Sequence, residues 1–291
     1  MGPLELVKLD RLMKRSSGRP QVLICLIDGP VAMDHPDLSS ARIREELGQK
    51  SSFCTLASSV ACMHGTFIAG MLCARRGSSA PAICPDSTLL VRPIFQESSS
   101  ANGHMPSATS EELAAALTDA IGAGANVINL SAAITQPSSR GERKLQQALD
   151  YAAHREVLVV AAAGNHGMLG SSAITRHRWV IPVIGCDLKG QPTTESNLGS
   201  SIGKWGLAAP GQGITSLGTD GQPQTLGGTS VAAPFVTGTI ALLWSEFPGK
   251  SAAAIKLAVT QSGSRPRRTI VPPLLDSWAA YEALNTIGLE S

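Results

Sequence analysis

Long, uninterrupted apolar runs constrain the fold of this chain more than any other feature of its sequence. The clearest are residues 21–27 (Gln-Val-Leu-Ile-Cys-Leu-Ile), apolar from Val22 onward, and 157–163 (Val-Leu-Val-Val-Ala-Ala-Ala). Runs of this kind are typical of parallel strands that helices cover on both faces. Because segments with helical character alternate with them, we expect an α/β fold with a mainly parallel central sheet and helices on both faces.

The alternation is regular enough to assign individual elements along the chain. We expect strands at 21–28, 88–95, 126–131, 157–163, 180–186 and 205–209. We expect helices at 64–75, 109–123, 141–154, 230–246 and 250–261, and loops at 96–108 and 165–178.

The composition fits one large globular unit. Of the 291 residues, 43% are hydrophobic and only 16% are charged, so the chain can fill a sizeable core. Aromatic residues make up 4%, and packing must therefore depend on aliphatic side chains and alanine. The net charge of +2 favours neither a nucleic acid nor a membrane surface as a partner. No run approaches the ~18 apolar residues of a membrane-spanning helix, and the sequence indicates no oligomeric state.

Residues 1–20 lack the apolar core and small-residue cleavage site of a signal peptide. Leu4, Val7 and Leu12 can share one face of a short amphipathic helix, which we expect to pack on the body of the protein. We therefore interpret 1–20 as an N-terminal extension of a domain that spans 21–291, and we expect a cytoplasmic protein.

Residues 228–234 (Gly-Thr-Ser-Val-Ala-Ala-Pro) deliver one serine, Ser230, onto the first turn of an apolar helix. The unpaired N–H groups of a first turn favour developing negative charge. Pro234 is tolerated there because first-turn N–H groups have no intrahelical acceptor. Taken alone, Ser230 is as well explained as a helix cap. As a nucleophile it needs a base and a third group that orients the base.

His64 is the best candidate for the base among six histidines. It precedes an apolar stretch rich in small residues, Gly65–Leu72, which can lie close to a neighbouring element and hold the ring rigidly. His166 is the rival candidate, and a purely structural histidine is the alternative reading for both.

Asp28 is the candidate for the orienting carboxylate. It ends the apolar run 21–27, and Gly29-Pro30 then stops the strand. Open α/β sheets place their sites at the carboxyl ends of the strands. The alternative is an aspartate that only forms an Asx turn.

Asn165 ends the second apolar run as part of Ala-Gly-Asn. Its side-chain amide can donate a hydrogen bond to an oxyanion without changing the charge of the site. In isolation, a turn residue is the simpler interpretation.

The order Asp28, His64, Asn165, Ser230 and the motifs around these residues resemble the subtilisin-like serine peptidases, or subtilases. The matching motifs are 26–29 (Leu-Ile-Asp-Gly), 35–38 (His-Pro-Asp-Leu), 64–66 (His-Gly-Thr), 208–211 (Ala-Ala-Pro-Gly) and 228–234. The resemblance extends from about residue 21 to the C-terminus. It implies the three-layer subtilisin-like fold, a triad of Asp28, His64 and Ser230, and an oxyanion hole formed by Asn165 and Ser230.

The resemblance also implies that an extended peptide substrate binds along the chain after the strand 126–131. The residues there are Ser131, Ala132 and Ala133, and Ala133 occupies a position where the family commonly has glycine.

Within the family, Asp28-Gly29-Pro30-Val31 and Cys84-Pro85-Asp86 resemble peptidases that mature cyanobactins and similar ribosomally made peptides. The expected reaction is hydrolysis of a precursor peptide at a leader or recognition-sequence boundary. One relative in that group macrocyclises by transamidation, using a helical insertion between the catalytic Asp and His. The 36 residues from Asp28 to His64 leave no room for it, which favours hydrolysis. A catalytically silent, peptide-binding subtilase remains a further alternative.

No metal or cofactor is expected. Cys54, Cys62, Cys73 and Cys84 lack the spacing of a zinc site, although Cys54 and Cys62 flank the loop before His64 and are a candidate disulfide pair. In a reducing compartment they would remain thiols. The tight calcium site of secreted subtilases is replaced at 75–80 by a segment with two arginines and no carboxylate.

Overall fold

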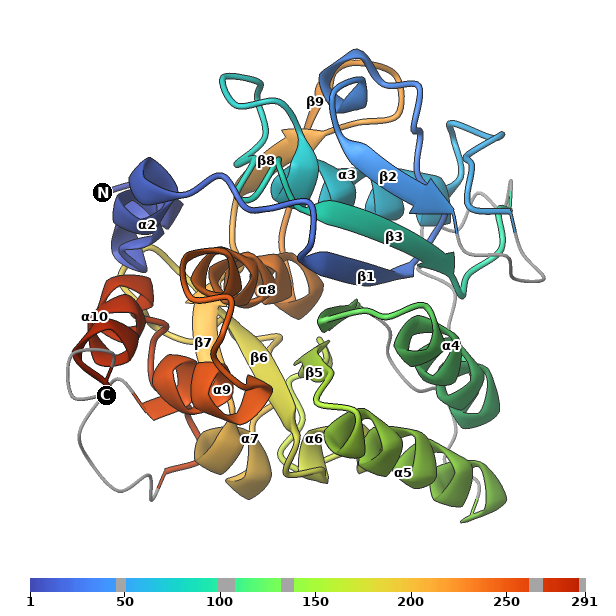
Figure 1. Cartoon of the computed structure of the whole chain (residues 1–291). Coiled ribbons are helices and arrows are strands. Elements are labelled where there is room, and N and C mark those ends of the chain that lie inside the picture. The colour runs from blue at the N-terminus through green and yellow to red at the C-terminus, as the bar shows by residue number, and fades with distance from the viewer. Residues whose placement is uncertain (46–50, 99–107, 132–138, 262–268, 288–291) are drawn as a thin grey trace.

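The computed structural model (Figure 1) describes residues 1–45, 51–98, 108–131, 139–261 and 269–287. Its centre is a seven-stranded sheet with the strand order β2-β3-β1-β4-β5-β6-β7, in which every neighbouring pair is parallel. The strands are β1 (Leu23–Asp28), β2 (Arg42–Glu45), β3 (Thr88–Pro93), β4 (Val127–Leu130), β5 (Leu158–Ala162), β6 (Val180–Cys186) and β7 (Leu207–Pro210). A separate antiparallel pair consists of β8 (Ile214–Leu217) and β9 (Pro223–Leu226).

Helices cover both faces of the sheet, as the apolar runs predict (Figure 1). Along β1, Ile24 and Leu26 belong to one buried cluster, whereas Cys25 and Ile27 belong to another. The first cluster includes residues of α2 (Leu9–Arg15), α3 (Val60–Cys73), α8 (Thr229–Glu246), α9 (Ala252–Gln261) and α10 (Ser277–Ile287). The second includes residues of α4 (Ser110–Gly122), α5 (Ser139–His154) and α6 (Ala173–Arg176). The three-layer α/β architecture is therefore confirmed.

The N-terminal segment folds onto the body of the protein. Here α1 (Pro3–Leu6) and α2 bring Val7, Leu9 and Leu12 into the core, where all three are fully buried. Arg15 pairs with Glu246 at the end of α8, with 3.4 Å between Nε and Oε2. The expected packing of the N-terminal segment on the body is confirmed, but the segment forms two short helices and not one, because the chain turns at Lys8, which has a φ of +52°.

Several element boundaries differ from the sequence-based expectation. Helix α3 begins at Val60, so His64 lies in its second turn and not at its start. The segment expected as a loop at 165–178 contains α6, which Ser172 caps by accepting a hydrogen bond from the Thr175 N–H. The loop expected at 96–108 lies mostly outside the described residues. The short helices η1 (Pro36–Leu38) and α7 (Ser200–Trp205) were not expected.

None of the helices in the described parts of the chain combines the length and the apolar character that a membrane crossing requires.

Candidate active site

Asp28, His64 and Ser230 come together at the carboxyl edge of the sheet. The Nδ1 atom of His64 lies 2.8 Å from Oδ1 and 3.0 Å from Oδ2 of Asp28. On the other side of the ring, Nε2 lies 3.0 Å from the Ser230 hydroxyl oxygen. Asp28 is fully buried, and His64 and Ser230 are each only 8% exposed. The three residues thus form one continuous chain of hydrogen bonds, although 36 positions separate Asp28 from His64 and 166 separate His64 from Ser230.

Asp28 is held by the end of its own strand. It is the last residue of β1, and its Oδ1 accepts a hydrogen bond from the Gly29 N–H at 2.7 Å. Its backbone carbonyl accepts a further hydrogen bond from the N–H of Ile94, just beyond β3. A carboxylate that is fixed in this way can orient an imidazole ring without moving itself.

Two glycines allow α3 to approach the end of β1. A Cβ atom on Gly29 would lie 2.0 Å from the Ala61 carbonyl oxygen, and one on Gly65 would lie 2.4 Å from the Pro30 carbonyl oxygen. Neither position accepts a larger side chain unless the backbone shifts. The small residues around His64, which the sequence indicated as a contact surface, therefore bring the histidine to Asp28.

The pKa of the His64 imidazole is raised above its ordinary value of 6.5. Burial is the largest single influence and by itself lowers this pKa, because it disfavours the charged ring. The negative charge of Asp28 and the hydrogen bond to it both raise the pKa and together outweigh burial. The site thus stabilises an imidazolium, the state that a general base enters when it takes a proton.

Ser230 occupies the first turn of α8, as the sequence predicts. Gly228 precedes the helix with a φ of +114°, a left-handed conformation that favours glycine. A Cβ atom there would also lie 2.9 Å from Nδ2 of Asn165. The N–H of Ser230 has the first-turn position in which helical N–H groups lack an intrahelical acceptor.

Asn165 lies beside this turn and is exposed to solvent. Its Oδ1 accepts a hydrogen bond from the Thr229 N–H at 2.8 Å, and this contact fixes which way the amide faces. The neighbouring Thr229 hydroxyl accepts from the Gly164 N–H at 3.1 Å. With its oxygen engaged, the side chain of Asn165 offers Nδ2 as a donor beside Gly228, two residues before Ser230.

The rival histidine has a different environment. His166 is exposed, and its backbone N–H donates to Asn197 at 3.1 Å. A second His–Asp pair does exist, because His177 Nε2 lies 3.1 Å from Asp150 Oδ1. That pair joins α5 to the end of α6 and has no serine beside it among the hydrogen bonds of the described residues.

Only part of the expected substrate-binding segment can be described. Ser131 is buried, its N–H donates to the Ile27 carbonyl, and its hydroxyl accepts from Asn129 Nδ2 at 3.0 Å. Ala132 and Ala133 lie outside the described residues. The Thr237 hydroxyl of α8 donates to Asn129 Oδ1 at 2.8 Å, so the end of β4 is tied to the helix that carries Ser230. The sequence analysis did not identify this network.

A model of the subtilase family matches residues 19–271. The chain belongs to the subtilase family. Thermitase from Thermoactinomyces vulgaris is 30% identical over 251 residues, which cover 83% of this chain and 81% of the relative. The thermostable alkaline protease of Halalkalibacterium halodurans is 28% identical over 242 residues, which cover 83% of this chain and 62% of the relative. The chain thus spans about three fifths of that relative's length.

Solved structures of subtilases superpose closely on this chain. A mutant of the protease domain of PatA has a TM-score of 0.81 at 27% identity and covers 92% of this chain and 97% of its own. The prenylagaramide maturation protease PagA has a TM-score of 0.81 at 27% identity and covers 95% and 98%. The PatG macrocyclase domain is 22% identical with a TM-score of 0.79, a likeness that concerns the fold.

This subtilase has an ion pair in the segment 75–80, which the resemblance matches to the calcium site of secreted subtilases. The Arg75 guanidinium lies 2.8 Å from Asp37 Oδ1, and Arg75 N–H donates to the Asp37 carbonyl. Arg76 donates to the carbonyls of Met13, Ser16 and Ile83 and so ties α2 to the chain after α3. A guanidinium disfavours a cation at this place, so the absence of a calcium site here stays a prediction.

Cys54 and Cys62 form a disulfide, which agrees with the candidate pair from the sequence. Cys73, Cys84 and Cys186 are buried thiols. Cys62 lies in the first turn of α3, two residues before His64.

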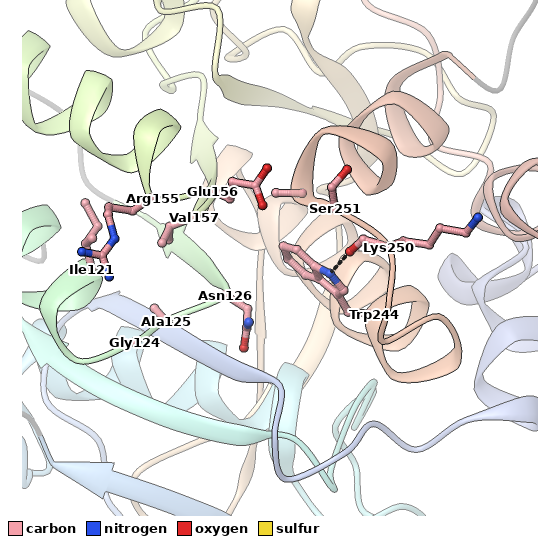
Figure 2. A pocket seen from close by; sticks show the side chains of 11 residues that line it. Ile121, Gly124, Ala125, Asn126, Arg155, Glu156, Val157, Trp244, Lys250 and Ser251 are labelled. Atoms are coloured by element: carbon pink, nitrogen blue, oxygen red, sulfur yellow. Dashed lines mark hydrogen bonds between the residues drawn. The ribbon is translucent and has the colours of Figure 1, made fainter.

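A pocket of about 320 Å³ lies at the opposite edge of the sheet (Figure 2). Asn126 and Val157, which line it, immediately precede β4 and β5. Trp244 also lines it and donates a hydrogen bond from Nε1 to the Lys250 carbonyl at 3.0 Å. None of the three triad residues contributes to this pocket.

Proposed function

We propose that this subtilase is a serine endopeptidase that cleaves peptide bonds through an acyl-enzyme. The observation that carries the proposal is the hydrogen-bonded chain from Asp28 through His64 to Ser230. We assign Ser230 as the nucleophile, His64 as the general base and acid, and Asp28 as the group that orients and stabilises the imidazolium. The proposed catalytic domain spans residues 21–291, with 1–20 as an N-terminal extension.

The geometry supports a defined sequence of steps. His64 Nε2 takes the Ser230 proton while the hydroxyl oxygen attacks the substrate carbonyl, and the carbonyl oxygen becomes an oxyanion. Asn165 Nδ2 and the Ser230 N–H are proposed to donate to that oxyanion. His64 then gives its proton to the leaving amine, and water releases the acyl group by the reverse sequence. Ser131, Ala132 and Ala133 are proposed to bind the substrate backbone.

For the substrate we propose a ribosomally made precursor peptide that is cut at a leader or recognition-sequence boundary. The support is the likeness to PagA and PatA, which are named as maturation proteases and are 27–28% identical to this chain. We further propose that the reaction takes place in the cytoplasm, where such precursors are synthesised.

Transamidation is the alternative outcome of the same acyl-enzyme. In the described residues between Asp28 and α3, the chain forms only the short helix η1 and the strand β2. This arrangement offers no helical insertion that would cover the acyl-enzyme, and it favours water as the acceptor. A silent, peptide-binding subtilase is disfavoured because a binding module gains nothing from a buried base aligned on a serine.

Mass spectrometry of the products formed from precursor peptides encoded beside this gene tests the proposal. The expected products are a linear leader and a linear core with a free new N-terminus, absent with Ser230→Ala. A macrocyclic core would establish transamidation instead. If the wild-type enzyme left the precursor peptides uncut, as Ser230→Ala should, the proposed substrate class would be wrong. A general peptide library would then show whether the enzyme cleaves any peptide.

A further inference from the structure

The disulfide next to the active site has a carboxylate beside it. Cys54 Sγ, Cys62 Sγ and a carboxylate oxygen of Glu97 all lie within 4.8 Å of one another. Cys54 and Cys62 are buried, and Glu97 is partly buried. The Cα atoms of the two cysteines are 5.5 Å apart, so both side chains reach the place that the Glu97 carboxylate also reaches. Two sulfurs and one carboxylate oxygen form a set of three convergent metal ligands.

Glu97 is fixed in this position by the loop that it contacts. Its Oε1 accepts hydrogen bonds from the N–H groups of Thr55 at 2.6 Å and Leu56 at 2.9 Å, and its Oε2 accepts from the Thr55 hydroxyl. The group is therefore a preorganised carboxylate.

The contact between Glu97 and Cys62 is not explained by the disulfide. Glu97 Oε1 lies 2.7 Å from Cys62 Sγ. A disulfide sulfur carries no proton, so in the oxidised pair the carboxylate faces sulfur lone pairs and gains nothing from the contact. A thiol proton or a shared cation makes the same contact favourable. The contact therefore suits a reduced or metal-bound cluster better than it suits the disulfide.

We propose that, once the Cys54–Cys62 disulfide is reduced, the two thiolates and the Glu97 carboxylate bind a zinc ion. Reduction by a thiol reductant transfers two electrons and two protons to the sulfurs, and the reductant is oxidised to its own disulfide. Zinc binding then releases the two protons. Thiolates favour zinc over calcium or magnesium, and three protein ligands leave a fourth, open position.

The disulfide and the zinc site exclude each other, but they have the same structural effect. Each one joins residue 54 to the first turn of α3, two residues before His64. The segment between the cysteines also accepts a hydrogen bond from the Thr219 hydroxyl at the Ala57 carbonyl, at 2.7 Å. Zinc would therefore hold this segment in place under the reducing conditions in which the disulfide is lost. Motif spacing could not reveal the site because Glu97 follows Cys62 by 35 residues.

The test uses the full chain, reduced and freed of metal by dialysis against a chelator, and zinc alone as the probe. Competition with a chromophoric chelator measures affinity, and cobalt substitution reports thiolate ligation by its charge-transfer absorbance. Reduced wild-type protein is expected to bind a single equivalent and to melt at a higher temperature with zinc. Glu97→Gln should weaken binding at least about tenfold, and Cys54→Ser or Cys62→Ser should abolish it. Oxidised wild-type protein should bind none.

Cys73→Ala is the matched control, because it removes a buried cysteine from the far end of the same helix. Its zinc affinity should equal that of the wild type. Zinc binding that survives in Cys62→Ser, or that is lost in Cys73→Ala with its fold intact, would overturn the assignment. If the serine variants do not fold, Glu97→Gln decides, since glutamine keeps a carbonyl oxygen for the Thr55 and Leu56 N–H groups and removes the charge. Unchanged affinity in that variant would contradict the proposed ligand set.

Discussion

The two edges of the central sheet both carry polar side chains, but they use them differently. At the carboxyl edge, the polar atoms of Asp28, His64 and Ser230 bond to one another in a chain that ends at the serine hydroxyl. At the amino edge, around the pocket of Figure 2, polar atoms bond to the backbone: Asn126 Oδ1 accepts from the Leu23 N–H at 2.8 Å. A pocket alone does not indicate catalysis. A chain of hydrogen bonds from a carboxylate through an imidazole to a serine hydroxyl does.

Replacing one serine at each edge by alanine tests this contrast, and it should give the largest difference in activity of all the variants. Ser230→Ala should reduce kcat/KM by roughly 10⁴–10⁶-fold because the nucleophile is lost, while the fold persists. Ser251→Ala, at the rim of the pocket, should change activity less than about twofold. It should cost only about 1 kcal/mol of stability, since the Ser251 hydroxyl caps α9 by accepting from the Ala254 N–H. Peptidase assays and melting curves measure both, and comparable losses of activity would invalidate the contrast.

A smaller loss is expected from the proposed oxyanion donor. Asn165→Ala should lower kcat by about 10²–10³-fold with little change in KM, because the donor acts mainly in the transition state. Asn165→Asp keeps the acceptor for the Thr229 N–H but removes the amide donor, and it should be no more active than Asn165→Ala. If Asn165→Asp retained wild-type kcat, the amide would have no role at the oxyanion.

The pH profile distinguishes the buried base at the carboxyl edge from an ordinary surface histidine. Protonated His64 cannot accept the Ser230 proton, so kcat/KM should fall as the pH decreases through the pKa of the imidazole. Because Asp28 raises this pKa, the midpoint of the acid limb should lie above 6.5. A midpoint below 6.5 would mean that burial outweighs the charge of Asp28.

The smallest effect is expected away from both edges, at Arg75 and Asp37. Arg75 belongs to the segment that the resemblance matches to the calcium site of secreted subtilases, and it pairs there with Asp37. Melting curves with excess chelator and with millimolar calcium should therefore superimpose, because an ion that bound the folded state would raise its stability. An upward shift with calcium would reveal a site formed by other ligands.

Prediction from the sequence worked best where one short segment contained both a recognisable strand or helix and the reactive side chain at its end. Asp28 ends a buried strand and Ser230 begins a buried helix, so each could be placed by its neighbours. Strand β2 escaped prediction because its sequence, Arg-Ile-Arg-Glu, is mostly exposed at the edge of the sheet.

Residues that act through long-range contacts could not be predicted. The hydrogen bond between Thr237 and Asn129 joins positions 108 residues apart, and Asn129 reads simply as part of an apolar strand. The proposed role of Glu97 as a zinc ligand likewise depends on its contacts with Thr55 and Cys62, which are 42 and 35 positions away. Such pairs depend on strand order, which local propensity and spacing do not determine.

The central claim is that His64 activates Ser230. Labelling with a serine-directed fluorophosphonate, followed by peptide mapping, tests it most directly. We expect one adduct, on Ser230, which is absent in Ser230→Ala. In His64→Ala the adduct should be lost or should form much more slowly. In His177→Ala, which breaks the second His–Asp pair, it should form at the wild-type rate. No adduct in the folded wild-type protein, or equal labelling in His64→Ala and wild type, would contradict it.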